Sequence, residues 1–364
     1  MSKSLCCCEY IDLNGEDSHI LGCCCNCHEV DACFERLITG KKISWKIINN
    51  IMLSGSDRLR IPWFGGARKV SLDALLPVVL LSIFIFCAAQ GVWLSVVAFA
   101  FLPIFLIYAH FLYMKLYSQT HFFYSWNITS TLFIFTLFEF VGVNILEIRE
   151  DENFAFFSLT LAVLFSIYKV RQKERMSYVI NEFQQDPSNL NNYCLDCNIR
   201  VPARAFHCYT CQVCVMQRDQ HCAWLNCCIA QYNHSWYMLF LIFNFSQLVL
   251  CSNLILTTAC HPFKVWGAIM LPDDCSDVYY DSQFAICFVT SLYCIEAAIF
   301  VGAVLIHECW LVTIGMTGHE FRNRNKRTLC CGLLASRPYS KGFIRNWIYY
   351  FKGGDNKMSY YYNI

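Results

Sequence analysis

Long apolar runs dominate the hydrophobic pattern of this 364-residue chain. The run from Ala74 to Met114 is too long for one membrane span, which needs about 20 residues, and the polar, flexible pair Gln90-Gly91 interrupts it near the middle. We therefore expect a hairpin of two spans there. Four further runs are long enough to cross a bilayer: Thr129 to Leu146, Phe154 to Val170, Tyr237 to Thr257 and Phe284 to Ile314. The pattern predicts six transmembrane helices rather than the buried helices of a soluble core.

Composition supports the same class of protein. Hydrophobic residues make up 56% of the chain and charged residues only 15%, which is typical of a polytopic membrane protein. The net charge of +1 provides no argument for a nucleic-acid partner. The first fifty residues lack a secretory signal peptide, so we expect the first span to direct insertion. Glu139, Asn144 and Glu296 lie inside apolar runs, where an unpaired charge is costly. We expect them to face one another, an internal cavity or an interface.

Basic residues predict the orientation. Clusters of lysine and arginine lie before the first span, after the fourth and after the sixth, at Arg58 to Lys69, Lys169 to Arg175 and Arg322 to Arg327. The turns Glu147 to Glu152 and Asp273 to Asp281 are mainly acidic. Because basic loops stay on the cytoplasmic side, we expect both termini, and the segment between the fourth and fifth spans, to face the cytosol.

That segment contains cysteines and histidines at short, repeated intervals. Two residues separate the thiols of Cys194 and Cys197, and the same gap recurs from Cys208 to Cys211 and on to Cys214. This gap lets two thiolates reach one tetrahedral zinc ion. The eleven sulfur and imidazole side chains of the segment are Cys194, Cys197, His207, Cys208, Cys211, Cys214, His221, Cys222, Cys227, Cys228 and His234. Two closed zinc sites need eight ligands, so three groups remain.

A surplus cysteine in a zinc fold is a candidate nucleophile. The thiolate is the attacking form, and nearby cations stabilise it. A purely structural zinc module fits the same spacing. From the residues alone we therefore predict zinc, and leave open whether the segment performs chemistry.

The run from Cys194 to Cys228, with Asn233 and Tyr237 beyond it, resembles the cysteine-rich domain of the DHHC protein S-acyltransferases, which attach palmitate to cysteines of other proteins. By position, the resemblance implies one zinc site formed by Cys194, Cys197, His207 and Cys214, and a second formed by Cys208, Cys211, His221 and Cys228. It also implies that Cys222 accepts the acyl chain from palmitoyl-CoA. Asp219 falls at the aspartate that orients the base of the family.

One position departs from the pattern. The first histidine of the family's motif, the general base beside the nucleophile, is Gln220 in this chain. A neutral amide forms hydrogen bonds but has no usable proton affinity near pH 7, and losing a base that works as a unit with its nucleophile costs orders of magnitude in rate. Cysteine depends least on a base, because a few per cent of it is thiolate at neutral pH. We expect weakened activity, with a catalytically inactive membrane adaptor as the alternative.

The resemblance extends from about Asp186 to Phe351. Asp186-Pro187-Ser188 stands where the family has Asp-Pro-Gly, and Thr317-Gly318-His319-Glu320 stands where it has Thr-Thr-x-Glu, a motif that lies against the active-site aspartate. Tyr339 to Phe351 matches the C-terminal packing motif of the family. We expect a buried Asn346 there to satisfy backbone groups rather than to perform chemistry.

Cysteines also cluster outside the zinc segment. Those at Cys6 to Cys8, Cys23 to Cys33 and Cys330-Cys331 suit S-palmitoylation or remain reduced cytosolic thiols, and for the N-terminal clusters a third zinc site is a weaker alternative. Cys260 and Cys275, between the last two spans, are candidates for a disulfide.

Taken together, the sequence predicts an α-helical polytopic membrane protein of about six transmembrane helices, with a small cytosolic Cys-rich domain that binds two zinc ions. The expected regions are a cytosolic Cys-rich N-terminus at 1–69, four spans at 70–175, the linker and zinc domain at 176–236, two spans at 237–315 and a cytosolic C-terminus at 316–364. The resemblance implies a protein S-palmitoyltransferase that uses palmitoyl-CoA and acts on membrane and cytosolic proteins with membrane-proximal cysteines. It also implies an endomembrane location, with the Golgi favoured over the endoplasmic reticulum.

Overall fold

The computed structural model forms two compact units, Met1–Leu80 and Leu81–Ile364. It describes residues 6–352 except for internal segments. Those segments are 7, 13–14, 16, 22–26, 41–50, 52–54, 56, 65, 117–119, 147, 180–191, 265–269, 324–336 and 338. Cys7, Cys23 to Cys25, Cys330-Cys331 and the Asp186-Pro187-Ser188 turn therefore lie outside the described residues.

The described residues of the first unit form two small hairpins and a helix ahead of the first apolar helix. Strand β1 (Glu9–Ile11) pairs antiparallel with β2 (Asp17–His19), helix α1 covers Cys27–Ile38, and β3 (Arg60–Ile61) pairs with β4 (Arg68–Lys69). The Arg60 guanidinium lies 4.0 Å from the centre of the Tyr10 ring and 2.9 Å from a carboxylate oxygen of Asp57. The contact with Tyr10 joins the two hairpins, and Asp57 holds Arg60 from just before β3. Among the described N-terminal thiols, Cys6 is exposed, and Cys8 and Cys33 are half-buried.

Six apolar helices follow in the part of the chain that the structure describes, close to the predicted runs. They are α3 (Leu72–Ala88), α4 (Val92–Leu116), α5 (Phe122–Leu137, continued by the π-turn η1 at Phe138–Gly142 and by α6 at Val143–Ile145), α7 (Glu150–Glu174, continued by the 3-10 turn η2 at Arg175–Ser177), α8 (His234–Ala259) and α9 (Ser282–Ile314). Five of them are long and apolar enough to cross a membrane. The sixth, α3, has 17 residues, which span about 25 Å and fall slightly short of a bilayer core. The helical run is interrupted between α3 and α4, at Gln90-Gly91, as predicted.

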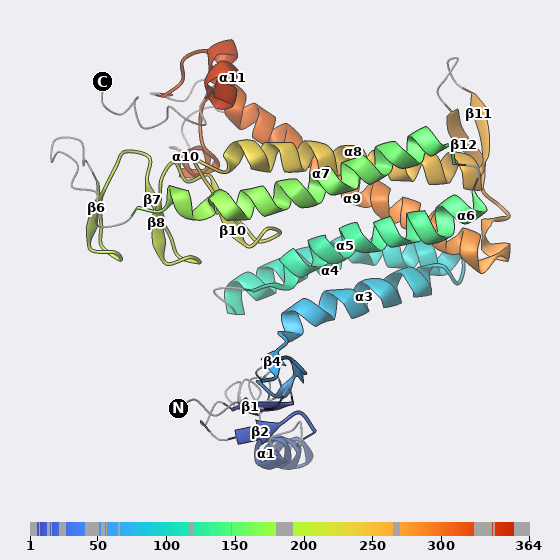
Figure 1. The fold of residues 1–364 in the computed structure, drawn as a ribbon, viewed down its shortest axis with the longest axis horizontal. Coiled ribbons are helices and arrows are strands. Elements are labelled where there is room, and N and C mark those ends of the chain that lie inside the picture. The colour runs from blue at the N-terminus through green and yellow to red at the C-terminus, as the bar shows by residue number, and fades with distance from the viewer. Residues whose placement is uncertain are drawn as a thin grey trace. The chain divides into compact units, whose positions relative to one another are not determined.

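Helices α7, α8 and α9 lie side by side in the second unit (Figure 1). Polar contacts between helices are buried inside the bundle: Gln247 of α8 donates to the hydroxyl of Thr160 of α7 at 2.7 Å, and Trp126 of α5 donates to the hydroxyl of Tyr293 of α9 at 3.0 Å. Leucines, valines and phenylalanines such as Leu161 and Phe300 remain exposed on the outside. An apolar exterior around a partly polar interior is the arrangement that lipid requires.

The two ends of this bundle differ. The cysteine-rich hairpins lie at one end, and the hairpin of β11 (His261–Lys264) and β12 (Met270–Asp274) lies at the other (Figure 1). A disulfide joins Cys260 to Cys275 at the base of β11–β12, so the pairing predicted from the two loop cysteines is confirmed.

The C-terminal elements pack on the end of α9. Helix α9 ends at Gly315, whose φ of 71° is the left-handed conformation that favours glycine. In α11 (Phe343–Lys352), Asn346 donates to the carbonyl of Thr313 at 2.9 Å and accepts from the N–H of Lys341 at 2.9 Å. The prediction that a buried Asn346 satisfies backbone groups is confirmed.

Two of the polar residues predicted within the spans have described partners. Glu139 accepts a hydrogen bond from Asn153 at 3.3 Å, and Asn144 donates to the carbonyl of Phe140 on its own helix at 2.7 Å. The π-turn at Phe138–Gly142, which carries Glu139, leaves no trace in the hydrophobic pattern.

Candidate active site and metal centres

Three consecutive hairpins position the cysteines and histidines. They are β5 (Asn192–Cys194) with β6 (Ile199–Val201), β7 (Phe206–Cys208) with β8 (Val213–Val215), and β9 (Gln220–Cys222) with β10 (Cys227–Ile229). In each, the residue just before the second strand has positive φ: Asn198 at 56°, Gln212 at 56° and Asn226 at 46°. Asparagine tolerates this left-handed conformation. The repeated turn lets a Cys-x-x-Cys pair fold back on itself at the tip of the first and second hairpins.

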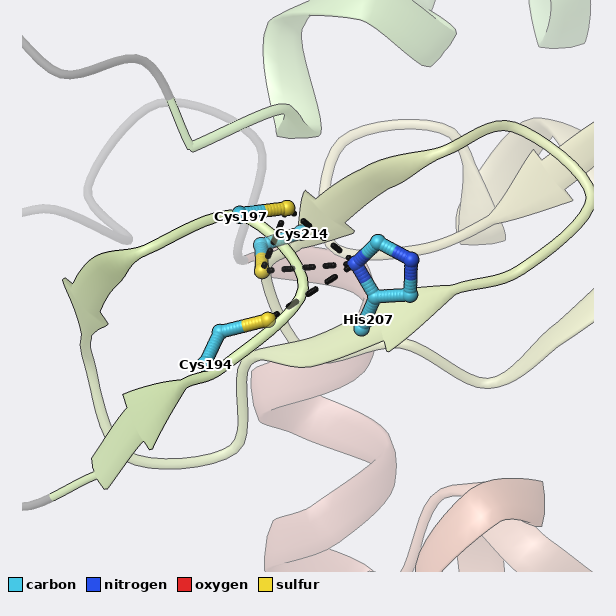
Figure 2. Close-up of side chains that lie close together, drawn as sticks. All are labelled: Cys194, Cys197, His207 and Cys214. Carbon is cyan, nitrogen blue, oxygen red and sulfur yellow. Dashed lines mark hydrogen bonds between the residues drawn. The ribbon is translucent and has the colours of Figure 1, made fainter.

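The first cluster joins two hairpins. Cys194 and Cys197 come from the tip of the first hairpin, while His207 and Cys214 lie opposite each other in the second. Figure 2 shows the three thiols around one ring nitrogen: the Nδ1 of His207 lies 3.1 Å from the Sγ of Cys197, 3.7 Å from that of Cys194 and 4.0 Å from that of Cys214. The sulfurs of Cys197 and Cys214 are 3.6 Å apart.

The second cluster repeats the plan one hairpin later. Cys208 and Cys211 come from the tip of the second hairpin, and His221 lies opposite Cys228 in the third. The Nδ1 of His221 lies 3.9 Å from the Sγ of Cys208, 3.4 Å from that of Cys211 and 3.7 Å from that of Cys228. Glu174, in the last turn of α7, accepts a hydrogen bond from the N–H of Cys228 at 2.8 Å and so connects this cluster to the bundle.

Both clusters fit a tetrahedral zinc ion. Zinc–sulfur bonds of about 2.3 Å separate the corners of a tetrahedron by about 3.8 Å. The ring nitrogen of each histidine lies 3.1 to 4.0 Å from the three sulfurs of its cluster, and all four ligand atoms of each cluster lie within 4.8 Å of one another. Three thiolates and one imidazole are a common structural donor set, in which the protein fills every coordination position. The structure thus brings together, in two groups of four, the eight residues that the resemblance assigned to zinc.

Cys222 belongs to neither group. Side chains alternate along a strand, so the neighbours His221 and Cys222 of β9 point to opposite faces, and Cys222 pairs across the hairpin with Cys227. Its thiol is buried. Burial raises the pKa of the Cys222 thiol to about 11, while hydrogen bonds from nearby backbone N–H groups and from Tyr237 act in the opposite direction. The residue that shares its face of the strand is Gln220.

Asp219 is buried at the start of the third hairpin. One of its carboxylate oxygens accepts a hydrogen bond from the N–H of Gly318, and its backbone carbonyl accepts one from Arg322 at 2.8 Å. Burial and the nearby charge of Glu308 raise the pKa of Asp219. A Cβ atom at position 318 would lie 3.1 Å from this carboxylate. The expectation that the Thr317-Gly318 motif lies against the aspartate is confirmed.

The same motif begins helix α10 (Gly318–Asn323). Glu320 accepts a hydrogen bond from the N–H of Thr317 at 2.9 Å, and the Thr317 hydroxyl accepts one from the N–H of Glu320 at 3.3 Å. This reciprocal arrangement is a capping box, which the Thr-x-x-Glu spacing indicates in a sequence. The guanidinium of Arg204 donates two hydrogen bonds, of 2.6 and 2.9 Å, to the carboxylate of Glu320. It also lies 4.5 Å from the centre of the Tyr339 ring. Through Arg204, the motif therefore connects the zinc domain to the C-terminal segment that contains Tyr339.

Two residues of the site were missed by the sequence reasoning. The Nε2 of Gln220 donates to one carboxylate oxygen of Glu308 at 3.3 Å, and the other oxygen of Glu308 lies 3.2 Å from the Nε2 of His234. Glu308 lies in the last apolar run, where an unpaired carboxylate is costly, and that cost is the signal in the sequence that points to it. His234 was among the surplus groups of the zinc segment and had no assigned role.

Comparison with known proteins agrees with the geometry. The sequence profile of the family described as DHHC palmitoyltransferase matches residues 187–325. Palmitoyltransferase ZDHHC23 of Mus musculus is 28% identical, in an alignment that covers 95% of this chain and 92% of that protein. The Homo sapiens protein of the same name is 28% identical, over 91% of this chain and 93% of its own, and Palmitoyltransferase ZDHHC23-B of Danio rerio is 26% identical, over 94% and 91%.

Proposed function

Because the chain belongs to the DHHC palmitoyltransferase family, we propose that it is a protein S-palmitoyltransferase whose acyl-carrying residue is Cys222. The sulfur of Cys222 attacks the thioester carbonyl of palmitoyl-CoA, the bond from that carbonyl to the CoA sulfur breaks, and CoA leaves with the proton that Cys222 loses. In the second step the thiol of a target protein attacks the acyl-Cys222 thioester, and Cys222 regains a proton.

One observation carries this assignment: Cys222 lies on the face of β9 opposite its metal-cluster neighbour His221, at the end of the helical bundle. The turn after Cys222 enters the bundle through Trp224, whose ring centre lies 5.2 Å from that of Phe123 on α5 and 5.6 Å from that of Phe300 on α9. An acyl chain attached at Cys222 would therefore start beside apolar helices. Each methylene buried there contributes about 0.8 kcal/mol, so the helices bind the donor without many polar contacts.

Zinc in the two Cys/His clusters would hold the three hairpins in register and take no part in the acyl transfer. Asp219 has the position of the orienting carboxylate. The proposed targets are membrane and cytosolic proteins with membrane-proximal cysteines. The basic clusters favour a cytosolic zinc domain, and membership of the family favours an endomembrane location, with the Golgi ahead of the endoplasmic reticulum.

The test is incorporation of an alkyne-palmitoyl group from its CoA thioester into purified protein that carries serines at Cys6 to Cys8, Cys23 to Cys25 and Cys330-Cys331. We expect hydroxylamine-sensitive label in this parent protein and its loss in Cys222→Ser. Cys227→Ser is the matched control, because Cys227 is buried directly opposite Cys222 in the same hairpin, and it should keep the label.

Equal labelling of Cys222→Ser and the parent would remove Cys222 from the reaction. An unlabelled parent with both metal clusters filled would instead support the catalytically inactive adaptor.

A further inference from the structure

A groove lies between α5 and α7, near the end of α7 that leads into the zinc domain. It has a volume of about 520 Å³ and changes in character along its length. Apolar side chains, among them Ile128 and Leu164, line the part nearer the middle of the bundle. Aromatic and basic side chains line the other part, at Tyr124, Tyr168, Arg171 and Arg175. The lining residues of α7 recur every three or four positions, so they form one stripe along the helix.

The length of α7 places its basic residues at the level of lipid headgroups. The span Glu150–Ser177 has 28 residues and therefore covers about 42 Å, whereas the hydrocarbon core of a bilayer is about 30 Å thick. No charged residue lies between Glu152 and Lys169, so this apolar part fills the hydrocarbon. The final turns, which contain Arg171 and Arg175, extend beyond it.

The two arginines of the groove have no acidic partner. The guanidinium of Arg171 lies 4.2 Å from the centre of the Tyr124 ring and so bridges α7 to α5. Among the described residues, no carboxylate forms an ion pair with Arg171 or Arg175. Their neighbour Glu174 accepts a hydrogen bond from the N–H of Cys228 at 2.8 Å instead. The described lining of the groove thus presents two positive charges and no negative one.

Charge and depth together fit an anionic glycerophospholipid. Arginine binds phosphate through paired, charge-assisted hydrogen bonds, and Ile128 and Leu164 offer apolar contacts for the first methylenes of an acyl chain. The volume is within the range of about 300–1,000 Å³ that is usual for ligand sites. Tyr168 is exposed, so the groove is open and the rest of the lipid tails can stay in the bilayer. A zwitterionic headgroup would bring a cation for which the described lining has no carboxylate.

We propose that this groove binds an anionic phospholipid of the leaflet on the side of the zinc domain, with its phosphate held by Arg171 and Arg175. Basic pockets between transmembrane helices bind anionic headgroups in this way. The bound lipid would join α5 to α7 in the same turn of α7 in which Glu174 holds the third hairpin. The inference goes beyond the proposed acyl transfer and does not depend on it.

The groove is separate from the path proposed for the acyl chain. That path begins at Trp224, which packs on Phe123 of α5 and Phe300 of α9. Tyr124 is the next residue of α5 and lies about 100° further round the helix, where it contacts α7 through Arg171. Palmitoyl-CoA and a phospholipid would therefore occupy different places and should not compete.

The test is lipid binding by the purified full chain, titrated with phosphatidic acid and measured by native mass spectrometry. We expect one tightly bound phosphatidic acid per chain, and weaker binding of phosphatidylcholine with the same acyl chains. Arg171→Gln/Arg175→Gln removes two charge-assisted donors and should weaken the binding of phosphatidic acid about 100-fold. Zinc content and elution as a single species check that each variant is folded.

Lys169→Gln/Lys173→Gln is the matched control. It removes the same charge from the same turns of α7, but neither lysine lines the groove, and their amines lie over the rings of Phe165 and Trp236. Screening by salt limits the effect of charges that do not touch the ligand, so the affinity should stay within about fivefold of wild type. Leu164→Trp is a second variant, which keeps both arginines and fills the apolar part of the groove, and it should also lose the bound lipid.

Four results would overturn the inference. Equal weakening by the arginine and lysine pairs would show general attraction to a basic surface, and equal binding of phosphatidic acid and phosphatidylcholine would show that charge is not recognised. Displacement of the lipid by inorganic phosphate would make the groove a site for the free anion. Displacement by an equimolar amount of palmitoyl-CoA would assign the groove to the acyl donor.

Discussion

Asn233→Ala removes the side chain that joins the second metal cluster to two helices. The amide oxygen accepts from the N–H of Ala230 at 2.8 Å, and the amide nitrogen donates to the carbonyls of Cys228 at 2.8 Å and Val170 at 3.1 Å. Asn233 is fully buried, so alanine leaves three backbone groups without this partner. Each costs about 1–3 kcal/mol. With the lower value for each of the three groups, the free energy of local opening of the third hairpin falls by about 3 kcal/mol. The opening equilibrium constant then rises roughly 100-fold.

Hydrogen–deuterium exchange of purified protein in detergent measures this opening directly. Peptides that cover β9 and β10 should exchange roughly 100-fold faster in Asn233→Ala than in the wild type. Asn253→Ala is the matched control, because it makes the same substitution at an exposed position of α8, the helix that begins directly after Asn233, and it should leave these peptides unchanged. If the two variants exchange within about threefold of each other, a difference of about 0.6 kcal/mol, the amide does not hold the hairpin and the reasoning is wrong.

Further changes test other parts of the account. Elemental analysis should find two zinc ions per chain, one for each Cys/His cluster, and Cys197→Ser should lose the ion of the first cluster; a folded, zinc-free protein would contradict this. Alkylation of the denatured, unreduced protein should leave Cys260 and Cys275 unmodified, and Cys260→Ser should destabilise the β11–β12 hairpin by about 3 kcal/mol for a closed loop of this length. Asn346→Ala should release α11 from α9 at a cost of about 1–3 kcal/mol for each lost partner, seen as faster tryptic cleavage at Lys341 and Arg345; unchanged cleavage would show that the helix is held by other contacts.

Local spacing accounts for what the sequence could predict. A Cys-x-x-Cys pair brings its thiols together through four residues of chain, so the grouping of Cys194 with Cys197 depends on no distant contact. The break at Gln90-Gly91 and the capping pattern of Thr317 and Glu320 are local in the same sense. The disulfide of Cys260 and Cys275 was found because the two thiols lie in one short loop.

The contact between His234 and Glu308 could not be predicted from local spacing. The two residues are far apart in the chain and meet only because α8 and α9 pack in one particular rotation. The residues of α9 are apolar on nearly every side, so no hydrophobic stripe marks which face turns inward. The length of α3 could not be predicted for a related reason, because a uniformly apolar sequence does not show where a helix begins or ends.

Transfer of the acyl chain from Cys222 to a target cysteine is the second step of the proposed reaction, and it can be measured separately from the loading of Cys222. Purified protein in liposomes is first loaded with alkyne-palmitate, the remaining palmitoyl-CoA is removed, and a peptide with one cysteine beside a membrane anchor is added. We expect label to leave Cys222 and to enter the peptide cysteine at the same rate, with no transfer from Cys222→Ser protein. Label that stays on Cys222, or that reaches the peptide equally from Cys222→Ser protein, would contradict it.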